Sequence, residues 1–256
     1  MRSIAIILSV FFLALSAQAR CSSRGLYTYP SEGELSANSL FLLEGYALSR
    51  EVVRGLNAKF PVYLLSDKGE KVKLIVKEYN EGQFYLSQAL LQPEKGLNMG
   101  ETYTFCIDSL PPYEALGRYN ASTGKNEKLR YTISKTADLE KPVLRSGPVF
   151  WKDEYAMFGC GPLSYVHFRM DVEDRSLLLV KATVQDMQSG KTSTFYLLSG
   201  GRELSLGHGM CSGSFAFEQG KEYEVQFAYM DASGNRLETP SGKIRFRGPV
   251  PGERGG

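Results

Sequence analysis

Histidine, tryptophan and cysteine are scarce in this chain of 256 residues, and neither sign of charge dominates. The sequence has two His, one Trp and four Cys, with 30 Lys and Arg against 28 Asp and Glu. So small a net charge predicts no basic surface for nucleic acid and no polybasic patch for a membrane. Hydrophobic residues make up 43% and charged residues 23%, which is typical of a globular chain.

Long hydrophobic runs are also missing, except at the N-terminus. Arg2 precedes the apolar residues 4–15, and Ala17-Gln18-Ala19 follows them as a small-x-small sequence. This pattern predicts a signal peptide cleaved after Ala19; the alternative is an uncleaved membrane anchor. Arg20 stands before Cys21, where a lipoprotein signal needs a small residue, so no lipid anchor is expected. We expect the mature chain to be secreted or periplasmic, with no membrane insertion.

The four cysteines predict disulfide bonds, because a signal peptide directs a chain to an oxidising compartment. Four cysteines allow three pairings. We favour Cys21–Cys106 and Cys160–Cys211, since each pair stays within one half of the chain. Each bridge would contribute about 2–4 kcal/mol by closing a long loop. The alternative is that one or more of these cysteines stay free and buried.

Helical periodicity is nearly absent, and short strand patterns fill the chain. About seven strand segments occur in each half at a spacing of roughly 8–15 residues, and one helical turn is expected near residues 49–57. These patterns predict an all-β fold with two tandem β-sandwich domains. The expected division is residues 1–19 for the signal peptide, 20–137 and 138–247 for the domains, and 248–256 for a disordered Gly/Pro-rich tail.

The two halves repeat the same turn and corner residues at a nearly constant offset, which favours an internal duplication. In a sandwich, a Tyr near the start of a strand bonds its hydroxyl to the backbone of the preceding corner. A glycine before it lets the chain turn with positive φ. We therefore expect structural corners at two tyrosines. The repeated pairs, 120 or 121 residues apart, are Gly69 with Gly190, Gly100 with Gly220, and Tyr103 with Tyr223.

These motifs resemble the bacterial immunoglobulin-like and fibronectin type III-like modules of secreted proteins. The residues that carry the resemblance are Pro30-Ser31-Glu32-Gly33, Leu91-Gln92-Pro93 with Gly100-Glu101-Thr102-Tyr103, and Gly220-Lys221-Glu222-Tyr223 with Asp231-Ala232-Ser233-Gly234-Asn235. The chain departs from true immunoglobulin domains, because Trp151 precedes Cys160 and no Cys…Trp…Cys spacing occurs. The resemblance implies a binding, adhesion or spacer module, although a fold does not determine function.

His208, Met210 and Cys211 form the one cluster of soft ligands, a set that copper would favour. The second histidine, His167, falls on an expected strand, and Cys211 is expected to be oxidised. We therefore interpret the cluster as a glycine-rich corner held by a disulfide, and predict neither a metal site nor a cofactor.

Several acidic loop residues could offer oxygen ligands to Ca²⁺. No spaced D-x-D-x-D-G pattern occurs, and acidic residues in sandwich loops more often form solvated turns. The candidates are Asp171, Glu173, Asp174, Asp231 and Asn235.

No catalytic motif stands out. Ser212 and Ser214 lie near His208, but a nucleophile elbow needs Gly-x-Ser-x-Gly between a strand and a helix. Paired carboxylates for glycoside hydrolysis are set by space rather than by spacing, so the sequence leaves them open. We predict no catalytic residue and no enzyme.

The expected function is a non-enzymatic binding or adhesion module for an unknown protein or glycan. The alternatives are a structural spacer or accessory subunit of a cell-envelope assembly, and a hydrolase with a site at the domain junction. An exposed aromatic cluster would favour binding, uniformly polar faces a spacer, and a deep cleft with two facing carboxylates a hydrolase. The sequence has 15 Tyr and 14 Phe, which suit either a binding surface or ordinary strands and cores.

Overall fold

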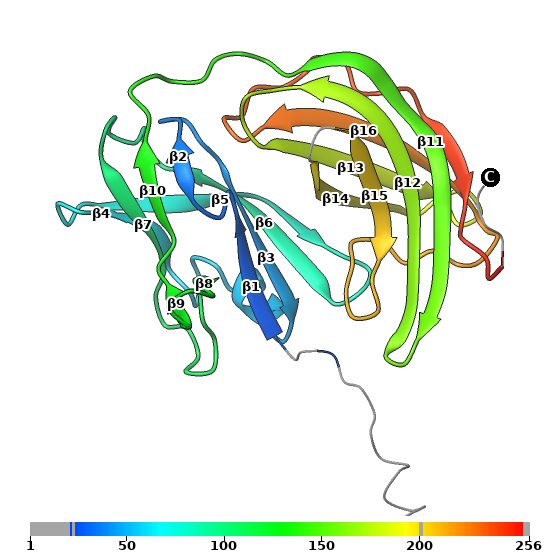
Figure 1. Ribbon diagram of the computed structural model, residues 1–256, viewed down its shortest axis with the longest axis horizontal. Coiled ribbons are helices and arrows are strands. Elements are labelled where there is room, and N and C mark those ends of the chain that lie inside the picture. Colours follow the sequence, from blue (N-terminus) through cyan, green and yellow to red (C-terminus); the bar gives the residue numbers. More distant parts are fainter. Residues whose placement is uncertain (1–20, 22–23, 200–201, 253–256) are drawn as a thin grey trace, which may run out of the picture.

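The computed structural model describes residues 21, 24–199 and 202–252, so the predicted signal peptide lies outside the described part. β-strands dominate these residues, and the predicted all-β fold is confirmed. The one helix among them, α2 (Arg50–Arg54), is five residues long. No helix in the described ranges is long and apolar enough to cross a membrane. Figure 1 shows two groups of strands side by side, one from each half of the chain.

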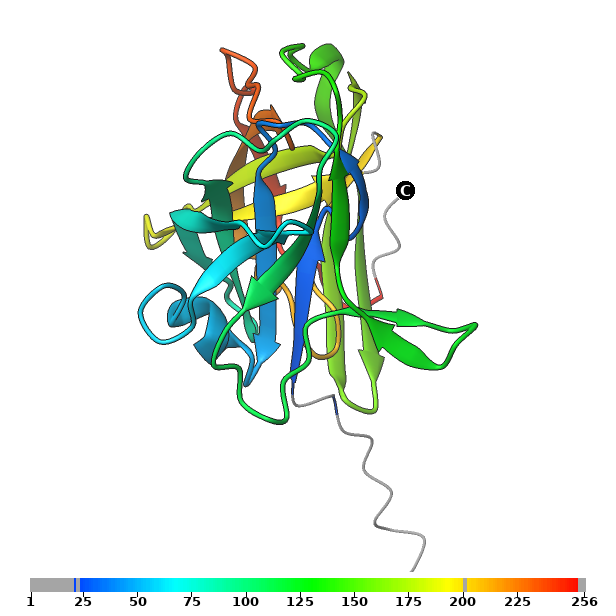
Figure 2. The ribbon, with the colours of Figure 1, turned by 90° about the vertical axis from the view of Figure 1, so that its left-hand side faces the viewer.

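The N-terminal half is one continuous arrangement of eight strands in the order β1-β3-β6-β5-β4-β7-β10-β2 (Figures 1 and 2). β5 joins its two layers, because residues 71–73 pair with β4 and residues 74–81 pair with β6. The core between the layers includes Phe41, Leu64 and Tyr131. The strands are β1 (Arg24–Tyr29), β2 (Gly33–Leu35), β3 (Phe41–Ala47), β4 (Val62–Ser66), β5 (Lys71–Glu81), β6 (Leu86–Pro93), β7 (Thr102–Ile107) and β10 (Arg130–Ile133), and β8 (Arg118–Asn120) and β9 (Lys125–Glu127) form a separate hairpin.

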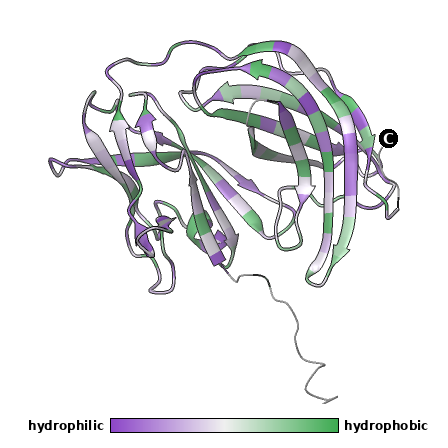
Figure 3. Ribbon diagram, viewed as in Figure 1, coloured by the Kyte–Doolittle hydropathy of each residue, from purple (hydrophilic) through white to green (hydrophobic). Residues whose placement is uncertain are grey.

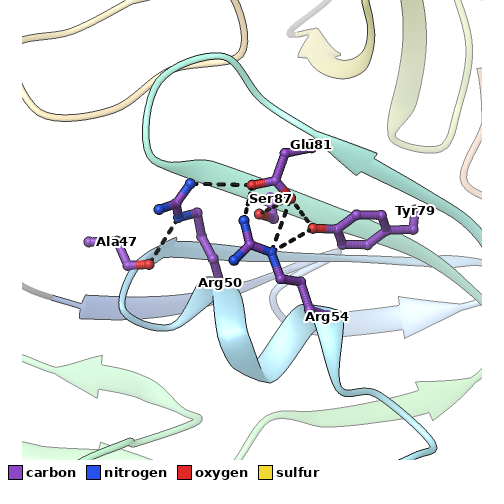
Figure 4. A network of polar contacts seen from close by, with 6 residues as sticks. All are labelled: Ala47, Arg50, Arg54, Tyr79, Glu81 and Ser87. Carbon is purple, nitrogen blue, oxygen red and sulfur yellow. Dashed lines mark hydrogen bonds and ion pairs between the residues drawn. The ribbon is translucent and has the colours of Figure 1, made fainter.

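Polar contacts hold α2 against the ends of β5 and β6 (Figure 4). Arg50 and Arg54 on the helix both donate to the carboxylate of Glu81, and the hydroxyls of Tyr79 and Ser87 donate to it as well. Burial would raise the pKa of Glu81, but these hydrogen bonds outweigh it and hold the pKa below its ordinary value. The charged network therefore fastens the short helix to the sheet.

The C-terminal half forms two separate sheets, β11-β12-β15 and β14-β13-β16-β17. Its core lies between them and includes Phe168, Val180 and Phe227. β11 and β12 form a long hairpin at the side of the molecule (Figure 1). The strands are β11 (Val143–Phe158), β12 (Gly161–Glu173), β13 (Leu178–Asp186), β14 (Thr192–Ser199), β15 (Glu203–His208), β16 (Glu222–Asp231) and β17 (Ile244–Arg247).

Both halves repeat one strand arrangement. β1-β3-β6 corresponds to β11-β12-β15, and β5-β4-β7-β10 corresponds to β14-β13-β16-β17. The hairpin glycines Gly69 and Gly190 have φ of 86° and 72°, and both occupy the turn between the corresponding strand pairs. Residues 134–142 connect the last strand of one half to the first strand of the other. The shared order supports the internal duplication, while the exact domain boundaries stay a prediction.

The two expected corner tyrosines have the same geometry. The hydroxyl of Tyr103 accepts a hydrogen bond from the backbone N–H of Asn98 at 3.1 Å, and that of Tyr223 accepts from the N–H of Glu218 at 2.9 Å. Both tyrosines are buried, and burial raises both pKa values. Each bond is therefore the hydroxyl-to-backbone contact that a tyrosine corner requires.

The cysteine pairing differs from the prediction. Cys21 is bonded to Cys211, while Cys106 and Cys160 are free, so the pairs Cys21–Cys106 and Cys160–Cys211 are wrong. The start of the first half lies beside the loop after β15, where the Cys21 Sγ is 4.0 Å from the Met210 carbonyl. Cys106 instead lies on β7 opposite Tyr63 of β4. A disulfide of this kind fits an oxidising compartment.

The ordered chain also extends past residue 247, where the tail was predicted to begin. The N–H of Gly248 donates to the Lys221 carbonyl, and its own carbonyl accepts from the N–H of Gly220. Gly248 is therefore tied to the corner before β16, which corrects the predicted start of the disordered tail.

Candidate functional site

An apolar contact joins the two halves. Side chains from the outer face of β3 and β6, and from the residue just before β3, pack against side chains from β13, β14 and β16, and all of them are buried. Water is excluded along this contact, so it favours one fixed arrangement of the halves. The residues are Leu40, Leu42 and Leu90 on one side, and Leu179, Tyr196 and Met230 on the other.

A side-chain amide continues the hydrogen bonding across this contact. Gln88 is fully buried; its Oε1 accepts from the Tyr196 N–H at 2.6 Å, and its Nε2 donates to the Tyr196 carbonyl at 3.1 Å. Its Nε2 also donates to Glu44 Oε1 at 3.1 Å. Gln88 thus pairs with β14 as a backbone peptide group would.

The turn between β5 and β6 inserts beside the same edge of the C-terminal half. The N–H of Gln83 donates to the Ser214 carbonyl, and Phe84 forms an isolated antiparallel bridge with Gly213. An ion pair between Lys181 and Glu78, at 2.7 Å, adds to the contact. The halves therefore meet at several independent points.

Next to this contact lies a groove of about 530 Å³, within the usual range for ligand pockets. The N-terminal half contributes Glu44 from β3 and Leu86 from β6. The C-terminal half contributes side chains from β11, β12, β14 and β15 and from the loop after β15. These residues are Glu154, Leu163, Tyr165, His167, Phe195, Tyr196, Leu197, Leu198, Ser205, Gly207, Ser212, Gly213 and Ser214.

His167 lies in the wall of this groove with only 8% of its side chain exposed. Its Nδ1 is 3.0 Å from the Ser205 hydroxyl and 3.0 Å from Glu203 Oε1. Its Nε2 is 3.5 Å from Glu154 Oε2 and has no hydrogen-bond partner within the described residues. A ring nitrogen in this state retains capacity to bond a further group.

Glu44 adds a carboxyl group with an altered pKa. Burial raises the pKa of Glu44 to about 7, although the hydrogen bond from Gln88 lowers it in part. Tyr165 faces the groove from β12, and its pKa is raised by burial and by the nearby charge of Glu154. The groove therefore combines acidic groups with an aromatic wall.

The β11 strand exposes several large apolar side chains. Val149, Phe150, Met157 and Phe158 are 59%, 46%, 66% and 49% exposed. Figure 3 shows hydrophobic residues at the end of the β11–β12 hairpin. Beside them, Arg169 lies over the Trp151 ring at 3.6 Å from its centroid. These are exposed apolar side chains on one edge strand; Phe150 and Phe158 lie eight residues apart along it and form no aromatic cluster.

A second cavity, of about 810 Å³, lies at the connection between the halves, with Asp138, Ser176 and Ser233 in its lining. The carboxylates of Asp138, Asp174 and Asp231 come within 4.8 Å of one another there. These oxygens are of the type that Ca²⁺ uses, so they could hold a hard cation.

The structure thus brings together part of the set of acidic residues that are candidate calcium ligands in the sequence, where their pattern favours solvated turns. Asp231 is fully buried and accepts hydrogen bonds from the Asn235 backbone and side chain. Burial raises the pKa of Asp231, and the bonds from Asn235 oppose that rise. Asp171 and Glu173 stay apart on β12, where Glu173 pairs with Arg145. Sequence reasoning missed Asp138, which lies in the connecting segment.

The predicted soft-ligand cluster is divided among other contacts. His208 is buried against the Phe84 ring, and its Nδ1 is 2.8 Å from the Gly209 carbonyl. Cys211 is in the disulfide, as the corner interpretation expected, although with Cys21. Ser212 and Ser214 line the groove, and the Ser214 hydroxyl donates to the Gly207 carbonyl.

No protein-family model matches the chain, and no curated protein is similar to it in sequence. Solved structures match at low identity. A cytokine receptor complex is 9% identical over 89% of this chain and 98% of that chain, with a TM-score of 0.27. A two-domain fibronectin type III segment of chicken tenascin is 10% identical over 87% and 95%, with a TM-score of 0.22.

The chain's own strand order and its two cores show two tandem β-sandwiches, and matches at these TM-scores add nothing to that. A pullulanase of Anoxybacillus sp. LM18-11 also matches, at 9% identity over 78% of this chain, with a TM-score of 0.24. The chain spans 23% of that pullulanase's length. Likenesses this weak carry no argument about function.

Proposed function

We propose that the protein is a non-enzymatic binding module of the secreted or periplasmic space, and that a partner protein docks along the free edge of β11. The observation that carries the proposal is the apolar, unpaired edge of this strand. Among the described residues, β11 pairs with β12 alone. Two of its exposed apolar residues, Met157 and Phe158, lie in the part of the strand with a regular register, and Val149 and Phe150 lie before that part.

The free part of the edge can be assigned from the hairpin geometry. Gly159 and Cys160 form a two-residue turn closed by Phe158 and Gly161. Such a closing pair is hydrogen-bonded, and bonded pairs then alternate along an antiparallel ladder. The N–H and C=O groups that point away from β12 are therefore those of Met157, Tyr155 and Asp153.

This segment lacks the backbone irregularities found earlier in the strand, and its charged residues, Lys152, Asp153 and Glu154, lie together at its start. Gly147, Pro148 and three register irregularities lie before Lys152, and features of this kind block strand pairing. Residues 152–158 keep a regular register with β12. An extended segment of a partner could add to this edge by backbone hydrogen bonds, with the apolar side chains giving further contact.

A photo-crosslinking amino acid in place of Tyr155 tests the proposal in the native envelope or its medium. We expect a specific adduct that is lost when Met157→Lys is added, since an edge lysine opposes strand pairing. Met187→Lys, at the tip of the β13–β14 hairpin, is the matched control and should keep the adduct. Equal loss or equal retention in both folded variants contradicts binding at β11.

A spacer function is the second candidate, because the contact between the halves is built to be rigid. The buried leucine cluster, the Gln88 bonds and the Cys21–Cys211 bridge all restrict the angle between them. A spacer needs no ligand at β11. Complete absence of adducts from a folded, correctly located protein would favour it.

A further inference from the structure

We propose that the groove at His167 binds the basic side chain of a lysine or arginine carried by a protein ligand. This inference rests on the proposed function, since the ligand is the segment that docks along β11. Glu154 of β11 lines the groove and lies between Asp153 and Tyr155, whose backbone groups form the free edge, so the groove begins next to that edge. A long side chain from an added strand would reach from one to the other.

The first argument is charge. Glu154 and Glu203 flank His167, and Glu44 faces the same groove from the N-terminal half. Across the described ranges, neither Glu154 nor Glu203 forms an ion pair with lysine or arginine; each contacts His167. The groove therefore has the Glu154 carboxylate in its lining and the Glu203 carboxylate beside His167, and an incoming cation could pair with both.

The second argument is that nearby cations are engaged elsewhere. Lys152 and Arg169 belong to the same sheet as His167, and both lie over the Trp151 ring. Lys181, on the other sheet, pairs with Glu78. Within the described residues, none of these three cations forms an ion pair with Glu154 or Glu203, so a ligand cation would meet carboxylates whose ion-pair contact is with His167.

The third argument is shape and partner capacity. His167 is more than nine-tenths buried, and its Nε2 has no hydrogen-bond partner in the part of the chain described. Leu86, Leu163 and Leu198 give the groove an apolar wall. A lysine or arginine has an apolar stem and a charged end, so it suits a groove with both features.

The two histidines make the test selective, because a histidine-labelled chain gives ring signals from His167 and His208 alone. The probe is a capped pentapeptide with a central arginine, and its control has citrulline, which is similar in shape but uncharged. We expect the arginine peptide to shift the His167 ring signals to saturation. His208, packed against Phe84, should stay unchanged, and citrulline should have no effect.

The variant Glu154→Gln with Glu203→Gln should weaken binding of the arginine peptide about tenfold or more, because it removes the two carboxylates that flank His167. Both side chains are nearly half exposed, at 49% and 45%, so the fold should survive. Glu154→Gln alone is the fallback if the double variant does not fold. Glu222→Gln on β16 is the matched control and should keep wild-type affinity.

An equal response to citrulline, or no shift of His167 in the folded chain, would overturn the inference. The proposed function is judged separately by the adduct at position 155. If that adduct persists while the arginine peptide fails, binding at β11 stands and the basic-side-chain site is wrong. If the peptide binds and the adduct is missing, the basic-side-chain site stands and binding along β11 is wrong.

Discussion

The two halves repeat one strand order but differ in how their two layers are joined at one edge. In the N-terminal half, β5 pairs with β4 and then with β6, so one strand closes the seam between the layers. Its counterpart β14 pairs with β13, and β15 belongs to the other sheet. The seam of the C-terminal half is thus left open.

The N-terminal half occupies that open seam. Gln88 bonds with Tyr196 of β14, and the turn at Gln83 and Phe84 bonds with Gly213 and Ser214 beyond β15. In the N-terminal half, the long strand β5 bonds to both layers and closes the gap between them. In the C-terminal half, residues of the N-terminal half fill the corresponding gap. The groove lies where the N-terminal half leaves part of this gap unfilled. The candidate site therefore exists because the C-terminal half, unlike the N-terminal half, has among its described residues no strand that joins its two layers.

The largest expected effect comes from cutting the covalent tie between them. Cys21→Ser with Cys211→Ser should lower the free energy of unfolding by about 3–4 kcal/mol, because the bridge closes a very long loop. Urea unfolding measures it, with Cys106→Ser as a control that should change little. Thiol titration of the unfolded, unreduced chain should find two thiols; none or four would contradict the pairing.

Gln88→Leu should break the non-covalent contact at the seam. The variant leaves the buried N–H and C=O of Tyr196 without partners, at a cost of about 3 kcal/mol. Gln92→Leu, on the same strand but exposed, is the matched control. If both variants unfold at the same urea concentration, Gln88 does not hold the halves together.

Glu44 gives the seam a pH dependence. Its folded pKa, about 7, is above its model-peptide value of 4.5, because burial disfavours the charged form. The protonated group's contribution to stability is therefore complete below pH 4.5 and is lost as pH rises through 7.

Relative to Glu44→Gln, the wild type should lose on the order of 2 kcal/mol between pH 4.5 and 8, at about 1.4 kcal/mol per pKa unit and with allowance for partial exposure. Urea unfolding of both proteins across this range is the measurement. Parallel stability curves would show that Glu44 is not the titrating group.

The smallest expected loss of stability comes from the tyrosine corner, which both halves contain. Tyr103→Phe and Tyr223→Phe should each cost about 1.5 kcal/mol, since each leaves one backbone N–H without its acceptor. The double variant should cost the sum, because the two sites are separate. Unequal single effects would show that the corners have diverged in their contribution.

The shared features were readable from the sequence because they are local. Gly69 and Gly190 mark hairpins, and Tyr103 and Tyr223 follow glycines by three residues, so spacing alone revealed them. The seam was not readable, because the sequence of β5 or β14 does not show which strand pairs with it beyond its hairpin partner.

The candidate site was mostly invisible for the same reason. Glu44, Glu154, His167 and Glu203 come from four strands, and no spacing links them. β11 itself was missed, because Gly147-Pro148 and mixed polar residues conceal a strand. The predicted disulfide pairing was wrong because it assumed that each pair stays within one half. Cys21 and Cys211 lie far apart in sequence and meet only where the two halves dock.

The contact between the halves is head-to-tail, since the β3–β6 face of one meets the β13–β14–β16 face of the other. Contacts of this type can propagate into open arrays. The face that would receive a third repeat is that of β12 and β15, which carries His167, Arg169 and Glu203 where the first half carries leucines. Charged and polar groups on that face would not reproduce the apolar contact that joins the two halves, so the face of β12 and β15 differs in chemistry from the face of β3 and β6.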